Sequence, residues 1–165
     1  MEFPTLEVTE LNRPFWEGLE QGVLRFQRCR RCQHAWLPPR RECPNCLAAD
    51  SCWEAASGRG RVVSWVVYHV AYHDAFRDRL PYNVAVIELD EGPRLITNVT
   101  CLPEALAIDL PVRLAVQRDF GLALPRFAPE QANDPLLPQR SPAAPLRRHD
   151  ADPADHRRPQ MRNGA

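Results

Sequence analysis

Hydrophobic and polar positions follow three patterns along the 165-residue chain. Before residue 25, apolar residues recur at helical spacing and form one face of a helix: Leu11, Phe15, Trp16, Leu19 and Val23. From Val62 to Tyr72 the chain is almost entirely β-branched or aromatic, which is typical of a long, bent strand. After residue 130, sizeable apolar residues become sparse. The pattern predicts a mainly β protein with a helical start and a tail that lacks a core.

The helical start, residues 1–24, is expected to form one or two short amphipathic helices. Thr9 can cap the first turn, and Pro14 is tolerated there because a first-turn residue needs no N–H donor. The pair Phe15–Trp16 most often packs internally in such a segment. On a short helix the same pair is also a candidate for docking onto a partner protein.

The β-rich centre, residues 58–130, has the element order of an OB-fold. After the long first run, further strands are expected over 82–89, 94–100, 112–120 and 122–127. The turn Asp90–Pro93 joins the second strand to the third, and residues 102–106 have the length of one helical turn. Five strands with a short helix after the third predict a five-stranded OB-fold barrel.

Between these segments stand two Cys-x-x-Cys pairs, Cys29/Cys32 and Cys43/Cys46. Four thiolates at this spacing suit a closed, structural Zn²⁺ site, which has no open position for water or substrate. We therefore expect a rubredoxin-like zinc ribbon over residues 25–57. Iron also accepts four thiolates. A redox role is disfavoured, because redox pairs come singly at the start of a helix. Cys52 and Cys101 are interpreted as packing residues.

Composition adds limits to this picture. The net charge is zero, which removes the simplest electrostatic argument for nucleic-acid binding. Arginines crowd the first knuckle, where they either offset the charge of the metal site or bind an anion or a partner. No apolar run reaches a membrane-spanning length and no secretory signal is visible, so we expect a cytoplasmic protein. Residues 131–165 are proline-rich and are expected to be a disordered tail.

Motifs that carry catalysis are missing. The chain has no Gly-x-Ser-x-Gly elbow, Walker loop or dinucleotide fingerprint. His69 and His73 share a face of the expected first strand but lie roughly 13 Å apart, too far to share a metal. Cys101 has no histidine assigned to it. These observations favour a binding or accessory role over an enzyme.

The motifs and their order resemble a known family, the zinc-ribbon/OB-fold proteins of a former domain-of-unknown-function class that accompany thiolases and acyl-CoA enzymes. The resemblance covers about residues 5–130. It is carried by these segments: Cys29–Cys32, Trp36–Arg40, Cys43–Cys46, Trp53, Ser57–Trp65, Pro81–Leu95, Thr97–Asn98 and Leu124–Phe127. One departure is clear. A glycine often follows each second knuckle cysteine in such ribbons, whereas this chain has Gln33 and Leu47.

The resemblance implies a non-catalytic subunit in a hetero-oligomer with a thiolase-like or lipid-transfer-protein-type enzyme. Such complexes perform thiolysis, aldol cleavage or acyl transfer, and the OB-fold contributes to the CoA-ester site in some of them. Four arginines near the expected ribbon–barrel junction suit the CoA phosphates: Arg40, Arg59, Arg61 and Arg94. Tyr82, with Phe15 and Trp16, is a candidate for an acyl channel or a partner contact.

Two other functions stay open at this point. Ribbons and OB-folds both serve in nucleic-acid-binding proteins, and the arginine-rich first knuckle is compatible with that use. Iron in place of zinc would make the ribbon an electron carrier, with a coloured and reducible centre.

Overall fold

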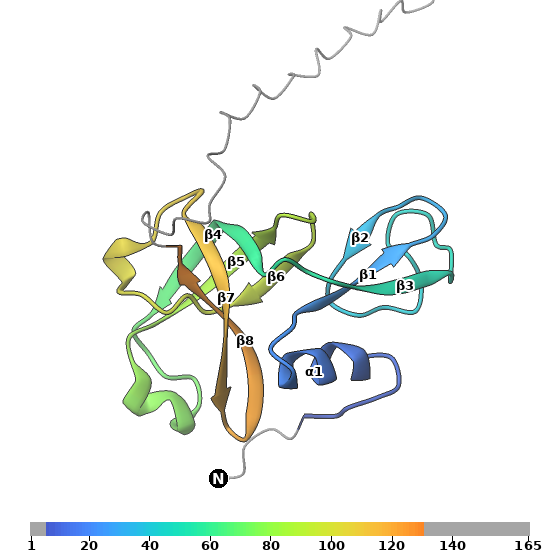
Figure 1. Ribbon diagram of the computed structural model, residues 1–165. Coiled ribbons are helices and arrows are strands. Elements are labelled where there is room, and N and C mark those ends of the chain that lie inside the picture. The colour runs from blue at the N-terminus through green and yellow to red at the C-terminus, as the bar shows by residue number, and fades with distance from the viewer. Residues whose placement is uncertain (1–5, 131–165) are drawn as a thin grey trace, which may run out of the picture. The chain divides into compact units, whose positions relative to one another are not determined.

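The computed structural model describes residues 6–130 and confirms a mainly β fold with one α-helix and two antiparallel sheets (Figure 1). Residues 1–5 and the predicted tail, 131–165, lie outside the described residues. Within the described part, no helix has the length and apolar character needed to cross a membrane.

One α-helix, α1, covers Arg13–Glu20. Pro14 occupies its first turn, as predicted, because a first-turn residue has no intrahelical acceptor for its N–H. Thr9 does not cap the helix directly. It exchanges hydrogen bonds with Asn12, the residue that precedes the helix: the Thr9 N–H donates to Asn12 Oδ1 at 2.8 Å. The chain therefore enters the helix through a closed turn.

The ribbon contains a three-stranded sheet in the order β2-β1-β3. Its strands are β1 (Arg25–Cys29), β2 (Ala35–Trp36) and β3 (Ser51–Ala55). The short β2 leads directly into the prolines at 38 and 39, as the sequence predicted.

The barrel has a five-stranded sheet in the order β6-β5-β4-β7-β8. These strands are β4 (Arg59–Tyr68), β5 (Tyr82–Leu89), β6 (Arg94–Thr97), β7 (Pro111–Asp119) and β8 (Leu122–Pro129). A single 3-10 turn, Pro103–Ala105, follows β6 where the short helix was expected. A bulge between Val62 and Ser64 bends β4, so that it pairs with β7 near its start and with β5 along its length.

The end of the first barrel strand was predicted wrongly. β4 stops at Tyr68, and the next residues lead into a second 3-10 helix over Asp74–Arg79. His69 and His73 therefore do not share a strand face. His73 instead caps the 3-10 helix, where its Nδ1 accepts a hydrogen bond from the Ala75 N–H at 3.2 Å. The cap by the His73 side chain favours a turn at this point, although Val70 and Tyr72 have high β propensity.

A buried side chain, Asn83 of β5, supports barrel closure. β6 ends at Thr97, three residues earlier than predicted, and Val99 forms an isolated parallel bridge with Phe127 of β8. The Asn83 amide holds that bridge from inside: Nδ2 donates to the Val99 carbonyl at 2.7 Å, and Oδ1 accepts from the Val99 N–H at 2.8 Å. Asn83 is 6% exposed. Its amide replaces the ladder that a longer β6 would have made.

A single hydrophobic core joins α1 to the barrel. Phe15 and Leu19 of α1 belong to the same buried cluster as Val62, Ile87 and Phe127 of the barrel. An exposed ion pair, Arg118 to Glu20, also links β7 to the end of α1. The helix is therefore part of the barrel's packing.

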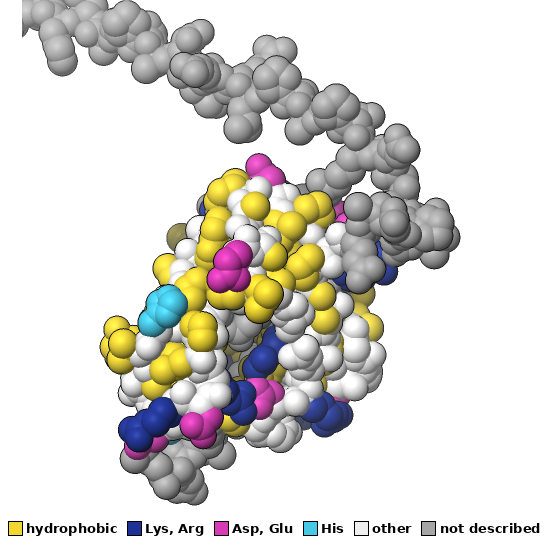
Figure 2. Space-filling model, turned by 90° about the vertical axis from the view of Figure 1, so that its left-hand side faces the viewer, with side chains coloured by type: hydrophobic (Ala, Val, Ile, Leu, Met, Phe, Trp, Pro, Cys, Tyr) yellow, Lys and Arg dark blue, Asp and Glu magenta, His cyan; other side chains and the backbone are white. Residues whose placement is uncertain are grey.

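Hydrophobic side chains also reach the surface on the loops at one side of the barrel. Figure 2 shows that face, where hydrophobic side chains gather over the upper part and charged side chains over the lower part. In Figure 1 the connections from β4 to β5 and from β6 to β7 lie on this side. They carry four exposed apolar residues: Val70, Tyr72, Leu102 and Ile108.

Replacing Asn83 with alanine should destabilise the metal-loaded protein by about 1–3 kcal/mol, because it leaves the buried Val99 N–H without a partner and removes one of the two bonds to the Val99 carbonyl, which also accepts from the Cys101 N–H. Urea unfolding would measure the change. Asn98→Ala is the control, since Asn98 is only half-buried and its side chain donates a single bond, to the Asn83 carbonyl. Equal losses for the two variants would contradict a special role for Asn83.

Candidate metal centre and adjoining pocket

The four knuckle cysteines meet at one point of the ribbon. All four Sγ atoms lie within 4.8 Å of one another, and the Cys29–Cys46 and Cys32–Cys43 pairs are each 3.6 Å apart. A tetrahedron with metal–sulfur bonds of about 2.3 Å has edges of about 3.8 Å. The thiols therefore already stand at the corners of a four-coordinate site that can bind a metal ion.

Each knuckle closes with a residue in the left-handed region. Gln33 has φ 61° and Leu47 has φ 58°, directly after the second cysteine of each pair. This turn sends the next N–H, of His34 or Ala48, toward the sulfur of Cys32 or Cys46. The departure from glycine thus leaves the knuckle geometry intact and costs about 1–2 kcal/mol of backbone strain per residue.

The two knuckles also match in their backbone pairing. The Cys29 N–H donates to the His34 carbonyl, and the Cys43 N–H donates to the Ala48 carbonyl, both at 2.9 Å. The equivalence follows from the shared Cys-x-x-Cys spacing.

Protonation differs sharply between two of the thiols. The His34 N–H, and then the Asn45 amide, lower the pKa of Cys32 to about 6. The Ala48 N–H acts in the same direction on Cys46, but the hydrogen bond with Cys32, burial and the other thiols outweigh it and raise its pKa to about 12. Four neighbouring thiolates repel one another, so without a cation they do not all ionise together. Metal binding must therefore displace protons.

The buried cluster around the metal site consists mainly of the cysteines. Its buried cluster contains Cys29, Cys43 and Trp36, so two of its three members are ligands. Cys52 stands apart from the ligand set on β3, where its thiol lies 3.7 Å from the Arg28 carbonyl. Cys101 packs against the barrel core, and burial raises its pKa.

Two of the arginines around the first knuckle are paired with acids. Arg28 pairs with Glu54 at 2.8 Å, and Arg30 lies 3.6 Å from Asp50. The acids lie more than 19 residues away along the chain, which is why the sequence showed an unbalanced basic patch. These ion pairs weaken the case for an anion-binding surface at the knuckle.

A pocket of about 400 Å³ lies between the ribbon and the β5–β6 hairpin. His34, Trp36 and Arg40 line it from the ribbon, and Glu88 and Arg94 line it from the hairpin. The structure thus brings together two of the four predicted CoA-binding arginines, Arg40 and Arg94. Trp36 and Glu88 were not predicted for this site, because their proximity depends on how the hairpin and the ribbon pack.

The other two arginines have different surroundings. Arg59 lies 3.1 Å from Glu130, and Arg61 bonds to Glu88 at 2.5 Å and also pairs with Asp109. Arg94 shares Glu88, with its Nε 2.9 Å from the other carboxylate oxygen. Both guanidinium groups lower the pKa of Glu88, chiefly through the bond from Arg61. Within residues 6–130, only Arg40 of the four makes no ion pair.

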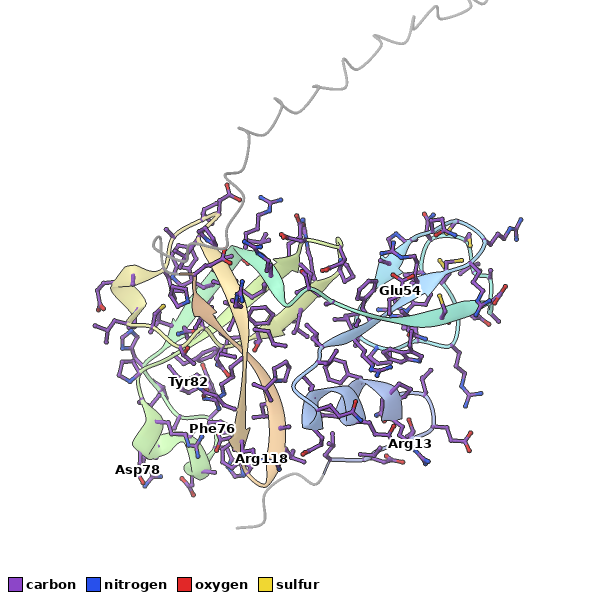
Figure 3. All side chains as sticks on the ribbon, in the orientation of Figure 1. Arg13, Glu54, Phe76, Asp78, Tyr82 and Arg118 are labelled. Atoms are coloured by element: carbon purple, nitrogen blue, oxygen red, sulfur yellow. The ribbon has the colours of Figure 1, made fainter. Side chains whose placement is uncertain are left out.

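The predicted partner or acyl-channel residues lie in two places. Phe15 is buried in the shared core, and the half-buried Trp16 ring meets it edge-on at 5.0 Å. Phe15 offers no surface for docking in this fold, and Trp16 offers part of one. Tyr82 begins β5, where its ring stacks on Tyr68 at 5.2 Å and lies 5.7 Å from Phe76 (Figure 3).

Comparison with known proteins gives matches over both parts of the chain. Residues 16–51 match the family model "ChsH2, rubredoxin-like zinc ribbon domain", and residues 53–117 match "ChsH2, C-terminal OB-fold domain". A solved structure described as the "Ltp2-ChsH2(DUF35) aldolase" is similar over 76% of this chain and 98% of the matched chain, with 37% identity and a TM-score of 0.66.

Two curated relatives extend the comparison. A "DUF35 domain-containing scaffold protein" of Methanothermobacter thermautotrophicus is 32% identical over 62% of this chain and 79% of the relative. The "Probable enoyl-CoA hydratase alpha subunit" of Thermomonospora curvata is 41% identical over 70% of this chain. The matched region spans only 36% of that longer protein.

Replacing Leu47 with glycine should tighten metal binding about two- to fivefold. Glycine adopts positive φ without a Cβ penalty, and the Leu47 side chain, which is 72% exposed, contributes little packing. Competition with a chromogenic chelator would measure the affinity. Leu47→Ala is the matched control, since it removes the side chain but keeps the Cβ. A comparable gain for alanine would show that side-chain removal, and not backbone strain, is responsible.

Proposed function

The chain belongs to the ChsH2 family of DUF35 proteins, which combine a rubredoxin-like zinc ribbon with a C-terminal OB-fold, and from this premise we propose that it is an accessory subunit of a thiolase-like acyl-CoA enzyme. In this proposal the partner carries the reacting groups, and this chain supplies scaffold and binding surface. The reaction supported is thiolysis, aldol cleavage or acyl transfer.

The observation that carries the proposal is the match to the ChsH2 chain of the Ltp2–ChsH2 aldolase, which extends over 98% of that chain. The match includes the ribbon as well as the barrel, so the likeness is not limited to a common barrel fold. The name "scaffold protein" of the archaeal relative agrees with a supporting role.

The metal centre fits this role as a structural element. We propose that it holds one Zn²⁺ through Cys29, Cys32, Cys43 and Cys46. Four sulfur ligands fill the tetrahedral shell, so the ion would supply charge neutralisation and cross-linking of the two knuckles, and no Lewis-acid position.

We propose the same division of the chain that the sequence predicted. A helical segment over 1–24, a ribbon over 25–57 and a barrel over 58–130 agree with the element order. α1 packs with the barrel, however, so the first and third segments would fold together.

We further propose that the pocket contacts CoA. Arg40 offers an uncommitted guanidinium at its edge, and Arg94 offers one that shares Glu88. Arg59 and Arg61 would each have to exchange a carboxylate for a phosphate, which makes Arg40 the first residue to test.

The accessory role predicts a specific copurification result. The untagged full-length chain should copurify from its own cells with a thiolase-like protein identifiable by mass spectrometry, with one equivalent of zinc and no visible colour. Cys43→Ser should lose both the metal and the partner, because the ribbon core consists mainly of ligands. Cys52→Ser is the control and should retain both, since Cys52 lies outside the ligand set.

A partner-free protein that turned over acyl-CoA by itself would overturn the accessory role. A red, reducible preparation would show that the site holds iron and not zinc, and would favour a role in electron transfer.

The CoA contact predicts a kinetic effect in the reconstituted complex. Arg40→Gln should raise KM for acyl-CoA roughly three- to tenfold and leave kcat nearly unchanged, because a phosphate contact far from the thioester binds ground and transition states alike. Arg13→Gln, at the start of α1 and outside the pocket, is the charge-matched control. Unchanged turnover kinetics in Arg40→Gln would show that the pocket does not contact CoA.

A further inference from the structure

β5 is mostly apolar on both faces, and its two polar residues are Asn83 on the inner face and Glu88 on the outer face. Its inward residues are buried: Asn83, Ala85, Ile87 and Leu89. Its outward residues Tyr82, Val84 and Val86 are only half-buried. An antiparallel strand with one face on a core normally alternates with polar residues on the other face, whereas near-continuous apolar strands occur where both faces are covered. Within residues 6–130, nothing from the chain itself buries the outward face completely.

The neighbouring strands extend this apolar surface. Val66 of β4 lies opposite Val84, and Ile96 of β6 lies opposite Val86. Val66 is 54% exposed and Ile96 is 72% exposed. These four residues form what we call the outer face, an uncharged patch across three adjacent strands.

The outer face has two distinct ends. At one end Tyr68 lies opposite Tyr82 and stacks on it, and the exposed Tyr72 ring meets Tyr68 edge-on at 5.9 Å. At the other end Glu88 is held between Arg61 and Arg94. Charges are therefore paired with one another at the border and absent from the centre. This is the arrangement of a protein–protein contact, with an apolar centre and a polar rim.

The outer face would form the centre of a larger contact. Its members on β5, Val84 and Val86, span three residues at about 3.3 Å, and neighbouring strands are about 4.8 Å apart, so the face covers roughly 14 Å by 10 Å, on the order of 140 Å². That is about a sixth of the roughly 800 Å² that each partner buries in a standard interface. The tyrosine end and the charged end would supply part of the remainder.

We propose that the outer face is the surface on which the thiolase-like partner docks, through an uncharged, apolar surface of its own. This inference rests on the proposed accessory role and identifies the surface of this chain that would bind the partner. An acyl chain needs an enclosing groove, whereas the outside of three adjacent strands encloses nothing. A lipid surface needs unpaired cations, whereas Arg61 and Arg94 are both held by Glu88.

Polar substitutions that preserve β propensity test the proposal. Ile96→Thr and Val66→Thr keep a β-branched side chain and remove apolar contact. Leu102→Thr is the matched control, because Leu102 is 74% exposed but lies on the loop after β6, outside the three strands. The probe is the thiolase-like protein identified by copurification and purified separately, titrated calorimetrically into the metal-loaded full-length chain.

We expect Kd to rise at least tenfold for Ile96→Thr and for Val66→Thr, and less than twofold for Leu102→Thr. Zinc content and the urea midpoint should match wild type in all three, which separates lost docking from lost folding. Wild-type affinity in both face variants would show that the outer face is not the docking surface, and it would not contradict the accessory role. A loss confined to Leu102→Thr would move the docking surface to the loops.

Two further outcomes would also decide against the proposal. A wild-type chain that is a dimer by light scattering, and that Ile96→Thr converts to a monomer, would make the outer face a contact between copies. A wild-type chain that binds no thiolase-like protein would remove the accessory role and the docking surface together.

Discussion

Mutual repulsion among four thiolates is the constraint on which the ribbon depends. Their sulfurs stand within 4.8 Å of one another, and two of the four cysteines, Cys29 and Cys43, make up two of the three members of the buried cluster, with Trp36 as the third. A segment of this size cannot offset its conformational entropy with so little buried apolar surface. A bound cation would neutralise this repulsion and cross-link the two knuckles. The backbone N–H groups of His34 and Ala48 also stabilise the thiolates, because they point at the sulfurs of Cys32 and Cys46. The proposed metal would therefore support the ribbon, whereas the barrel has its own core.

Much of this arrangement could be predicted from local sequence. The knuckle spacing gave the ligands, alternation and turn residues gave the five strands, and Pro14 marked the first turn of α1. The end of β4 could not be predicted, because the run continues with β-favouring residues and the cap by His73 is a competing local interaction. The length of β6 was missed for a related reason: Asn83, a distant residue, satisfies the Val99 backbone in place of a neighbouring strand.

The ion pairs of the charged residues could not be predicted from the sequence. Four arginines were grouped by their closeness to the ribbon–barrel junction, yet the partners of Arg59 and Arg61 come from remote parts of the chain: Glu130, Glu88 and Asp109. Ion pairing depends on tertiary packing, which local patterns do not encode. Arg40 differs from the other three only in the folded chain. The same holds for the pocket, since Trp36 and Glu88 are 52 positions apart.

Glu88 connects the pocket to the outer face, because it lines the pocket and also forms the charged end of the apolar surface. The ribbon side of the same pocket is made by the segment that follows the first knuckle, His34 to Arg40. Any change that unfolds the knuckles therefore removes one wall of the pocket and the support next to the charged end of the face. In the proposed role, a metal ion that touches neither CoA nor the partner would in this way control both contacts, and the ribbon and the OB-fold would act as one binding unit.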